Sequence, residues 1–348
     1  MLNKIISEQQ IQQAKKLVEK YDKIAIVTHI SPDGDAVGSS LALCHFLSEI
    51  GKGVNVIVPN NFPGFLKWMP GVKDIIVHEW KSSLAEEAIL SAELLFCLDF
   101  NVLKRIGAVA PLVEKATAKK ILIDHHPEPD NFCDVAISYP EISSTSELIF
   151  RFICRMGMFD DINRDCAECI YTGMMTDTGS FTYNSNDPHI YYIISELLEK
   201  GIDKDLIYSK VNNHYTENRL RLQGYVLYEK MKIFPELHTA LIVLSRKEEE
   251  RFQWRRGDTE GFSNMPLSID GIIFSVFIRE EENMIKMSFR SRGTFPANRF
   301  ASEVYGGGGH LNAAGGESYG TLEEAVALFE THLPDYSELL SNTKINEI

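Results

Sequence analysis

The sequence predicts an α/β protein whose N-terminal part is a mostly parallel sheet with helices on both faces. Apolar residues dominate four short runs, at 23–29, 54–59, 94–100 and 121–126, as is typical of buried strands. Helical patterns lie between these runs, and one of them begins at Val37. Alternation of buried strands with helices favours parallel pairing through helical crossover connections.

The C-terminal part predicts a smaller α+β domain, because its runs are less regularly interleaved. Three segments are typical of strands and two of helices, namely 237–245, 269–280 and 283–293, then 298–306 and 322–333. The residues before them are more polar and helical in pattern, as a connector is. We therefore expect a catalytic domain over 1–190, a helical connector over 191–235 and a second domain over 236–348.

Composition excludes several classes of protein. The chain has 348 residues, 44% hydrophobic and 24% charged, which is ordinary for a globular protein. Its apolar runs fall short of the roughly 18–20 residues of a membrane span, and its N-terminus lacks the apolar core of a secretory signal. We expect a cytoplasmic protein without a membrane partner. The net charge of −14 disfavours long duplex nucleic acid as a partner but leaves short anions open.

The six cysteines are interpreted as reduced core residues. Most are scattered among apolar neighbours, and only Cys166 and Cys169 form a CxxC pair. That pair lacks a second ligand pair and a thioredoxin-like context, and it lies in a helical pattern. A zinc or redox site is therefore disfavoured.

Carboxylates and imidazoles follow three of the predicted strands. His29 ends the first, Asp99 ends the third, and Asp124, His125 and His126 end the fourth. Ligands in parallel sheets bind beyond the carboxyl ends of the strands. We therefore expect these five side chains at one edge of the sheet.

Two further segments carry carboxylates with less specific patterns. Asp33 and Asp35 flank a glycine in the turn after the first strand, where one of them could simply cap the next helix. Asp177 lies at the end of a helical pattern, where an ordinary polar residue is also expected.

Together these residues predict a metal centre. Carboxylates that converge on one cleft repel one another unless cations neutralise them. Mixed carboxylate and imidazole ligands suit manganese, with magnesium or cobalt as alternatives, and the absence of thiolates disfavours a zinc–cysteine site. Two such ions form a clamp that activates water for displacement at phosphorus.

The ordered motifs THISPDGD, LDF, IDHH and MTDTG resemble the signature of the DHH phosphoesterase superfamily. The run YGGGGHLNAAGG at 305–316 is similar to the DHHA1 module, so the resemblance covers nearly the whole chain. The similarity is greatest to the nanoRNase/pAp phosphatase group. Members of that group trim very short oligoribonucleotides, dephosphorylate 3′-phosphoadenosine 5′-phosphate (pAp), or cleave linear or cyclic dinucleotides.

The resemblance implies a role for each residue of the motifs. One metal ion is expected on His29, Asp33 and Asp99, and Asp99 is expected to bridge to the second ion. The ligands implied for the second ion are Asp35, Asp99, His125 and Asp177. His126 is then expected to contact the scissile phosphate or assist the leaving group, while Asp124 orients a histidine.

The second domain is expected to hold the substrate. The resemblance implies roles for Gly307, Gly308, Gly309 and His310, since glycines let a phosphate approach the backbone; a flexible linker is the alternative. Arg290 suits a second phosphate, although a solvated strand face is also open. Arg292, Asn298 and Arg299 are weaker candidates.

We therefore predict a manganese-dependent phosphoesterase that acts on short nucleotides or oligoribonucleotides, with a homodimer left open. The alternatives are an inorganic pyrophosphatase or exopolyphosphatase, and a RecJ-like single-strand exonuclease. The pyrophosphatase reading is disfavoured by the GGGGH run. The exonuclease reading is disfavoured by chain length and acidic charge. A catalytically silent nucleotide-binding protein is a third reading, which a turnover assay would separate from an enzyme.

Overall fold

The computed structural model describes residues 4–213, 215–255 and 257–344. The chain divides into two compact units, Met1–His214 and Tyr215–Ile348. This boundary falls inside the segment 191–235, which the sequence predicts to be a connector. Along the described residues, every helix is too short or too polar to cross a bilayer.

The first unit is built on a parallel sheet with the strand order β3-β2-β1-β4-β5-β6. Every strand pair in it is parallel. The strands are β1 (Lys23–Val27), β2 (Gly53–Val58), β3 (Ile76–Val77), β4 (Leu94–Leu98), β5 (Lys119–Asp124) and β6 (Val135–Ser138). The four predicted strands are confirmed as β1, β2, β4 and β5, while the short edge strands β3 and β6 lack a recognisable apolar run.

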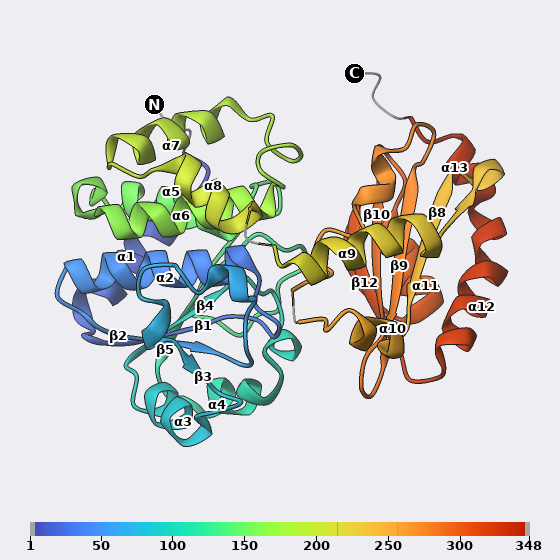
Figure 1. The fold of residues 1–348 in the computed structure, drawn as a ribbon. Helices are drawn as coiled ribbons and strands as arrows, with labels where there is room; N and C mark the ends of the chain where they lie inside the picture. The colour runs from blue at the N-terminus through green and yellow to red at the C-terminus, as the bar shows by residue number, and fades with distance from the viewer. Residues whose placement is uncertain (1–3, 214, 256, 345–348) are drawn as a thin grey trace. The chain divides into compact units, whose positions relative to one another are not determined.

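Helices cover both faces of this sheet, as the sequence predicts (Figure 1). They are α1 (Glu8–Lys20), α2 (Gly34–Glu49), α3 (Ser82–Leu90), α4 (Ala110–Lys115), α5 (Thr145–Arg155), α6 (Arg164–Asp177), α7 (Pro188–Glu199) and α8 (Lys204–Asn212). Side chains of β4 alternate between the faces: Phe96 packs under α1, α2, α5 and α6, and Leu95 packs against α3 and α4. Both faces are therefore buried, which explains the continuous apolar runs.

The second unit is a mixed sheet with the strand order β11-β12-β10-β9-β8-β7. Its β8–β9 pair is parallel and the other pairs are antiparallel. The strands are β7 (Met231–Phe234), β8 (Thr239–Leu244), β9 (Phe274–Glu280), β10 (Ile285–Ser291), β11 (Gly308–His310) and β12 (Ala313–Ser318). The predicted α+β class is confirmed, with β7, β11 and β12 as additions.

Helices also lie on both faces of the second sheet (Figure 1). They are α9 (Glu217–Tyr225), α10 (Arg246–Arg251), α11 (Ala297–Tyr305), α12 (Leu322–His332) and α13 (Ser337–Ser341). Phe274 and Phe289 pack with Phe300 of α11 and Phe329 of α12 in a cluster of aromatic rings. Leu222 of α9 belongs to a separate core on the opposite face.

Candidate metal centre

The order in which strands are added to the first sheet reverses at its centre, between β1 and β4. From β1 the strand order runs outward to β2 and β3, and from β4 it runs the other way to β5 and β6. His29 follows β1, Asp99 follows β4, and His125 follows β5, so these side chains leave three adjacent strands. A switch of this kind opens a crevice at the carboxyl ends of the strands, where ligands bind.

Three carboxylates reach the same edge from helices. Asp33 caps the N-terminus of α2 by accepting hydrogen bonds from the amides of Asp35 and Ala36, each at 3.0 Å. The capping reading of Asp33 is therefore confirmed alongside its place at the centre. Asp35 lies in the first turn of α2, and Asp177 is the last residue of α6.

Glycines allow α2 and α6 to approach closely enough to bring these carboxylates together. A Cβ on Gly38 would lie 2.8 Å from the carbonyl oxygen of Cys169 and 2.9 Å from Cα of Gly173. Contacts this short require a residue without a side chain. The CxxC pair, Cys166 and Cys169, lies on α6. Both cysteines are buried in the core, as predicted.

The first group of ligand atoms joins His29, Asp33 and Asp99. Nε2 of His29 lies 3.3 Å from Oδ2 of Asp99 and 3.9 Å from Oδ1 of Asp33. Their ligand atoms all lie within 4.8 Å of one another. Atoms that share one ion at about 2 Å are separated by similar distances, so the group fits a single cation.

The second group joins Asp35, His125 and Asp177. Nε2 of His125 lies 3.6 Å from Oδ2 of Asp177 and 4.0 Å from Oδ2 of Asp35. The same nitrogen is 3.6 Å from Oδ1 of Asp99. Asp99 therefore faces both groups, with Oδ2 toward His29 and Oδ1 toward His125.

The backbone at Asp99 has a left-handed conformation, with φ of +63°. Side chains adopt this region at a cost, and such residues concentrate at functional sites. Aspartate tolerates it better than most residues do. This backbone conformation directs the carboxylate toward the middle of the ligand group. Asp99 as a whole is only 2% exposed.

Hydrogen bonds through Nδ1 orient both histidine rings, with Nε2 directed toward the carboxylates. Nδ1 of His29 is 2.7 Å from the carbonyl oxygen of Ile30, and Nδ1 of His125 is 3.2 Å from that of Ile142. A carbonyl oxygen only accepts hydrogen bonds, so each Nδ1 carries the proton. In the neutral ring each Nε2 would carry the lone pair that binds a cation, which is the usual arrangement of metal-bound histidine.

The electrostatics of the group also favour a cation. Burial, with the nearby charges of Asp99 and Asp177, raises the pKa of Asp35 well above its usual range. Burial likewise raises the pKa of Asp177 to about 7. At Asp99 the hydrogen bond and charge of His29 outweigh burial and lower the pKa. Buried carboxylates so close together repel one another unless positive charge lies between them, so this donor set of oxygens and imidazoles fits divalent cations.

His125 responds to the same surroundings in the opposite sense. Burial would lower its pKa, but the charges of Asp177, Asp99 and Asp35 outweigh burial and raise the pKa to about 9. The carboxylates around His125 therefore attract a positive charge strongly.

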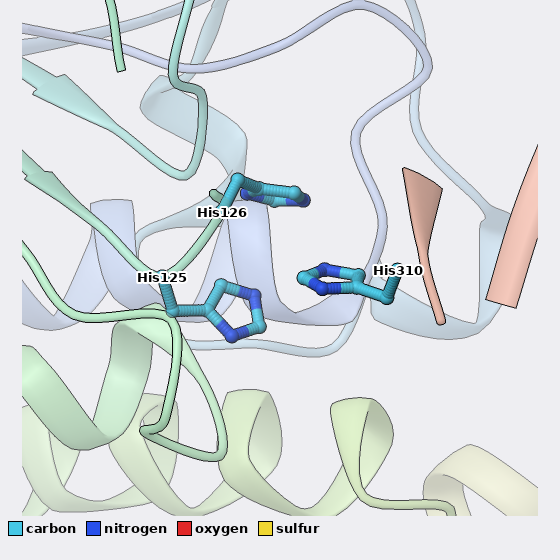
Figure 2. A group of neighbouring side chains, drawn as sticks. All are labelled: His125, His126 and His310. Atoms are coloured by element: carbon cyan, nitrogen blue, oxygen red, sulfur yellow. The ribbon is translucent and has the colours of Figure 1, made fainter. Parts of the chain in front are cut away.

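His126 is held differently from the other histidines. Its Nδ1 is 2.8 Å from Oδ1 of Asp124, and its backbone amide donates to Oδ2 of the same carboxylate at 3.0 Å. Figure 2 shows the rings of His125 and His126 beside each other after β5, and their centroids are 4.8 Å apart in an edge-on arrangement. The third residue labelled there, His310, belongs to β11 of the other unit.

Three of the predicted residues of the second unit, Arg290, Gly308 and His310, lie on one face of its sheet, whereas Gly309 pairs with Ala314 in the alternate row. Arg290 of β10 and His310 of β11 both pair with Ala313 of β12, so the three form a row across adjacent strands. Ser288 and Gly308 both pair with Gly315 in the next row on the same face. Small residues therefore separate the arginine from the histidine. Arg292 follows the end of β10 and is not part of these rows.

The glycines of this segment differ in what they permit. A Cβ on Gly307 would overlap the carbonyl oxygen of Gly315, and one on Gly309 would lie 2.5 Å from that of Ala313. Packing of β11 on β12 thus requires both. A Cβ on Gly308 would meet nothing within 4 Å. The glycine run is consequently a paired strand and not a flexible linker.

Sequence reasoning missed the contribution of the segment before α5. The amides of Thr145 and Ser146 donate to the Asp35 carboxylate, and the Thr145 hydroxyl donates to Asp99. The sequence signal was the cluster SSTSE at 143–147, which predicts a helix N-terminus but not its target.

The fold and the site define a class of protein, the two-unit α/β hydrolases that use divalent cations. Comparison with known families agrees: residues 23–174 match the DHH family, N-terminal domain, and residues 235–333 match the DHHA1 domain. The chain therefore belongs to the DHH/DHHA1 phosphoesterase family.

Relatives extend across nearly the whole chain. The "Bifunctional oligoribonuclease and PAP phosphatase NrnA" of Thermus thermophilus is 30% identical over 292 residues, covering 84% of this chain and 83% of the relative. The "Probable bifunctional oligoribonuclease and PAP phosphatase NrnA" of Streptococcus mutans is 26% identical over 307 residues, covering 88% and 93%. A solved structure described as an exopolyphosphatase-related protein from Bacteroides fragilis is 57% identical, has a TM-score of 0.94, and covers 98% of this chain and 100% of its own.

Proposed function

We propose that this protein hydrolyses phosphate esters of short nucleotides, namely oligoribonucleotides of a few residues and pAp, with two manganese ions as the preferred cofactor. The observation that carries the proposal is the placement of Asp99. One oxygen of its carboxylate faces His29 and the other faces His125, 3.3 Å and 3.6 Å away. A carboxylate between two sets of ligands suits a bridge between two cations.

The ligand sets follow from the two groups. His29, Asp33 and Asp99 would hold one cation, and Asp35, Asp99, His125 and Asp177 would hold the other. Bound divalent cations supply Lewis-acid activation of water and neutralise charge on the phosphoryl oxygens. The carboxylates and imidazoles of the chain fix the place where that chemistry happens.

His126 is proposed as the group that protonates the leaving oxygen. Asp124 holds its Nδ1 at 2.8 Å, which fixes the orientation of the ring. The Nε2 proton is then the one available for transfer. After transfer, Asp124 keeps the neutral ring in the same tautomer, so the ring can take up a proton again.

Arg290, Gly307, Gly308, Gly309 and His310 are proposed to hold the substrate. Guanidinium binds phosphate through two parallel hydrogen bonds, and the row of Arg290, Ala313 and His310 offers positive charge on a surface of small residues. The relatives named oligoribonuclease and PAP phosphatase support a nucleotide substrate of this size.

The proposed metal roles are tested by Asp99→Ala with manganese present. Loss of a ligand shared by both cations should abolish turnover and reduce the number of ions bound in calorimetry. Asp134→Ala provides a control, because Asp134 immediately precedes β6, at the amino end of the strands, and pairs with Lys119 on the surface. Manganese-dependent turnover close to wild type in Asp99→Ala would contradict the proposal.

The substrate is tested with a panel under one set of conditions. It contains pAp, pApA, cyclic di-AMP, oligoribonucleotides of increasing length, pyrophosphate and polyphosphate. We expect the highest kcat/KM for the shortest nucleotides. Faster turnover of polyphosphate would instead favour the reading that the name of the Bacteroides fragilis relative suggests.

Metal identity and assembly are tested separately. Manganese should support more turnover than magnesium or cobalt at equal occupancy of the sites. We also propose a cytoplasmic location and a homodimer. Reduced cysteines support the location, since six free thiols suit a reducing compartment. Sedimentation at several concentrations measures the oligomeric state.

A further inference from the structure

We infer that the first turn of α5 is a positioning device for the metal centre and that Thr145 is its central residue. This inference rests on the proposed function, because it treats Asp35 and Asp99 as metal ligands. It assigns a role to residues outside the ligand set. Thr145 is a positioning residue, since it acts through the two carboxylates that it contacts.

Backbone amides in the first turn of α5 donate hydrogen bonds to both carboxylate oxygens of Asp35. The amide of Thr145 donates to Oδ2 at 2.7 Å, and the amide of Ser146 donates to Oδ1 at 2.9 Å. The first amides of a helix have no partner within the helix, and its dipole favours negative charge there. Each carboxylate oxygen has two lone pairs, so the amides leave one on each for a cation.

The side-chain hydroxyl of Thr145 contacts a second carboxylate, that of Asp99. Its Oγ1 donates to Oδ1 of Asp99 at 3.0 Å. That oxygen is the one that faces His125, while Oδ2 faces His29. The hydrogen bond thus fixes the rotation of the carboxylate that directs one oxygen to each group. Thr145 thus contacts one carboxylate from α2 and one that follows β4.

Burial makes these contacts rigid. Thr145 and Ser146 are each 0% exposed, and Asp35 is 1% exposed. The helix is held in place by Ser144, whose side chain caps it by accepting from the amide of Glu147. The buried pair of Glu147 and Arg151 secures the next turn. Water cannot replace a lost hydrogen bond easily in such surroundings, so its removal should be costly.

The test compares Thr145→Val, which keeps the shape and the amide but removes the hydroxyl, with Thr145→Ser, which keeps the hydroxyl. Thr172→Val is the control, because its buried hydroxyl donates to the carbonyl of Glu168 within α6. Manganese binding to the metal-free full chain is measured by calorimetry, and kcat and KM are measured with an RNA dinucleotide. Thermal unfolding of each variant shows whether it is folded.

We expect Thr145→Val to weaken manganese binding and lower kcat by about 10–100-fold, the usual effect of removing a group that supports a metal ligand. KM should change little. Thr145→Ser should recover most of both quantities, and Thr172→Val should resemble wild type. Should Thr145→Val prove unfolded, Thr145→Ala carries the same expectation, since it removes the hydroxyl with less crowding.

Three results would contradict different statements. Wild-type manganese affinity and kcat in folded Thr145→Val would overturn the positioning role while leaving the proposed function intact. A wild-type chain that binds no divalent cation would overturn the metal centre itself. Equal losses in Thr145→Val and Thr145→Ser would also contradict the role of the hydroxyl.

Discussion

Both oxygens of the Asp124 carboxylate bind His126, one through the ring Nδ1 at 2.8 Å and the other through the backbone amide at 3.0 Å. The carboxylate therefore fixes the ring relative to its own backbone. It does so while buried, since Asp124 is 0% exposed.

Asp124→Asn should lower kcat by about 10–100-fold without weakening manganese binding. The amide keeps the size of the side chain but replaces the charged acceptor at the ring Nδ1 with a neutral group, so it holds the ring less firmly. Steady-state kinetics and calorimetry together check this. The double variant with His126→Ala should be no slower than His126→Ala alone, because the two residues act as a unit. Additive losses would separate the roles of Asp124 and His126.

Gly308→Ala should weaken substrate binding while leaving folding unchanged. The new Cβ would meet no protein atom within 4 Å, so it can obstruct only a ligand. We expect KM for short nucleotides to rise by about tenfold, the effect of losing about 1.4 kcal/mol of binding. Gly307→Ala is the contrast, since its Cβ would overlap Gly315 and should lower the melting temperature. An unchanged KM in Gly308→Ala would exclude close approach of the substrate there.

The affinity for manganese should increase with pH. In the metal-free protein the raised pKa of Asp177, about 7, and that of His125, about 9, mean that protons occupy these groups at neutral pH. A cation must displace them, because ligands bind metal in their deprotonated forms. Raising the pH through about 7 and then about 9 removes this competition. Calorimetry in buffers of different ionisation enthalpy measures the released protons, and an affinity that falls with pH would contradict the sign.

Gly173→Ala should destabilise the first unit by about 1–3 kcal/mol, the typical cost of overpacking a core. Its Cβ would overlap Oγ of Ser146 and lie 2.9 Å from Oδ1 of Asp35, so manganese binding should weaken as well. Gly224→Ala in α9 is the control, because among the described residues its Cβ would meet no atom within 4 Å apart from its chain neighbours and the backbone of its own helix. Differential scanning calorimetry measures the stability of the two variants, and titration calorimetry measures their affinity for manganese. A stable Gly173→Ala with full metal affinity would show that α2 and α6 can separate.

The sequence predicts the parts of this site that are local. His29, Asp99 and His125 each follow an apolar run, and residues at the ends of parallel strands meet at one edge whatever the strand order. The order itself, with β1 beside β4, has no signature in the runs. The resemblance to a known family supplied the grouping of these residues, which their spacing alone left open.

The contacts that sequence reasoning missed are long in range or depend on backbone amides. Thr145 lies 110 residues from Asp35 along the chain, and its amide carries no information about its partner. The pairing of β11 with β12 was missed because glycine and alanine are poor strand formers. There the absence of side chains permits close packing, a tertiary effect that overrides local preference.

The ligands of the proposed centre come from β1, α2, β4, β5 and α6, and thus from most of the first unit. Each of the two groups combines residues from segments that lie far apart in the sequence. Cation binding is therefore coupled to folding of the whole unit: at a concentration 100 times the Kd, a ligand that binds only the folded state adds about 2.7 kcal/mol to its stability. A newly synthesised chain would gain this added stability only after α6 has been made. The supply of cations would therefore affect the stability of the folded protein as well as its rate of turnover.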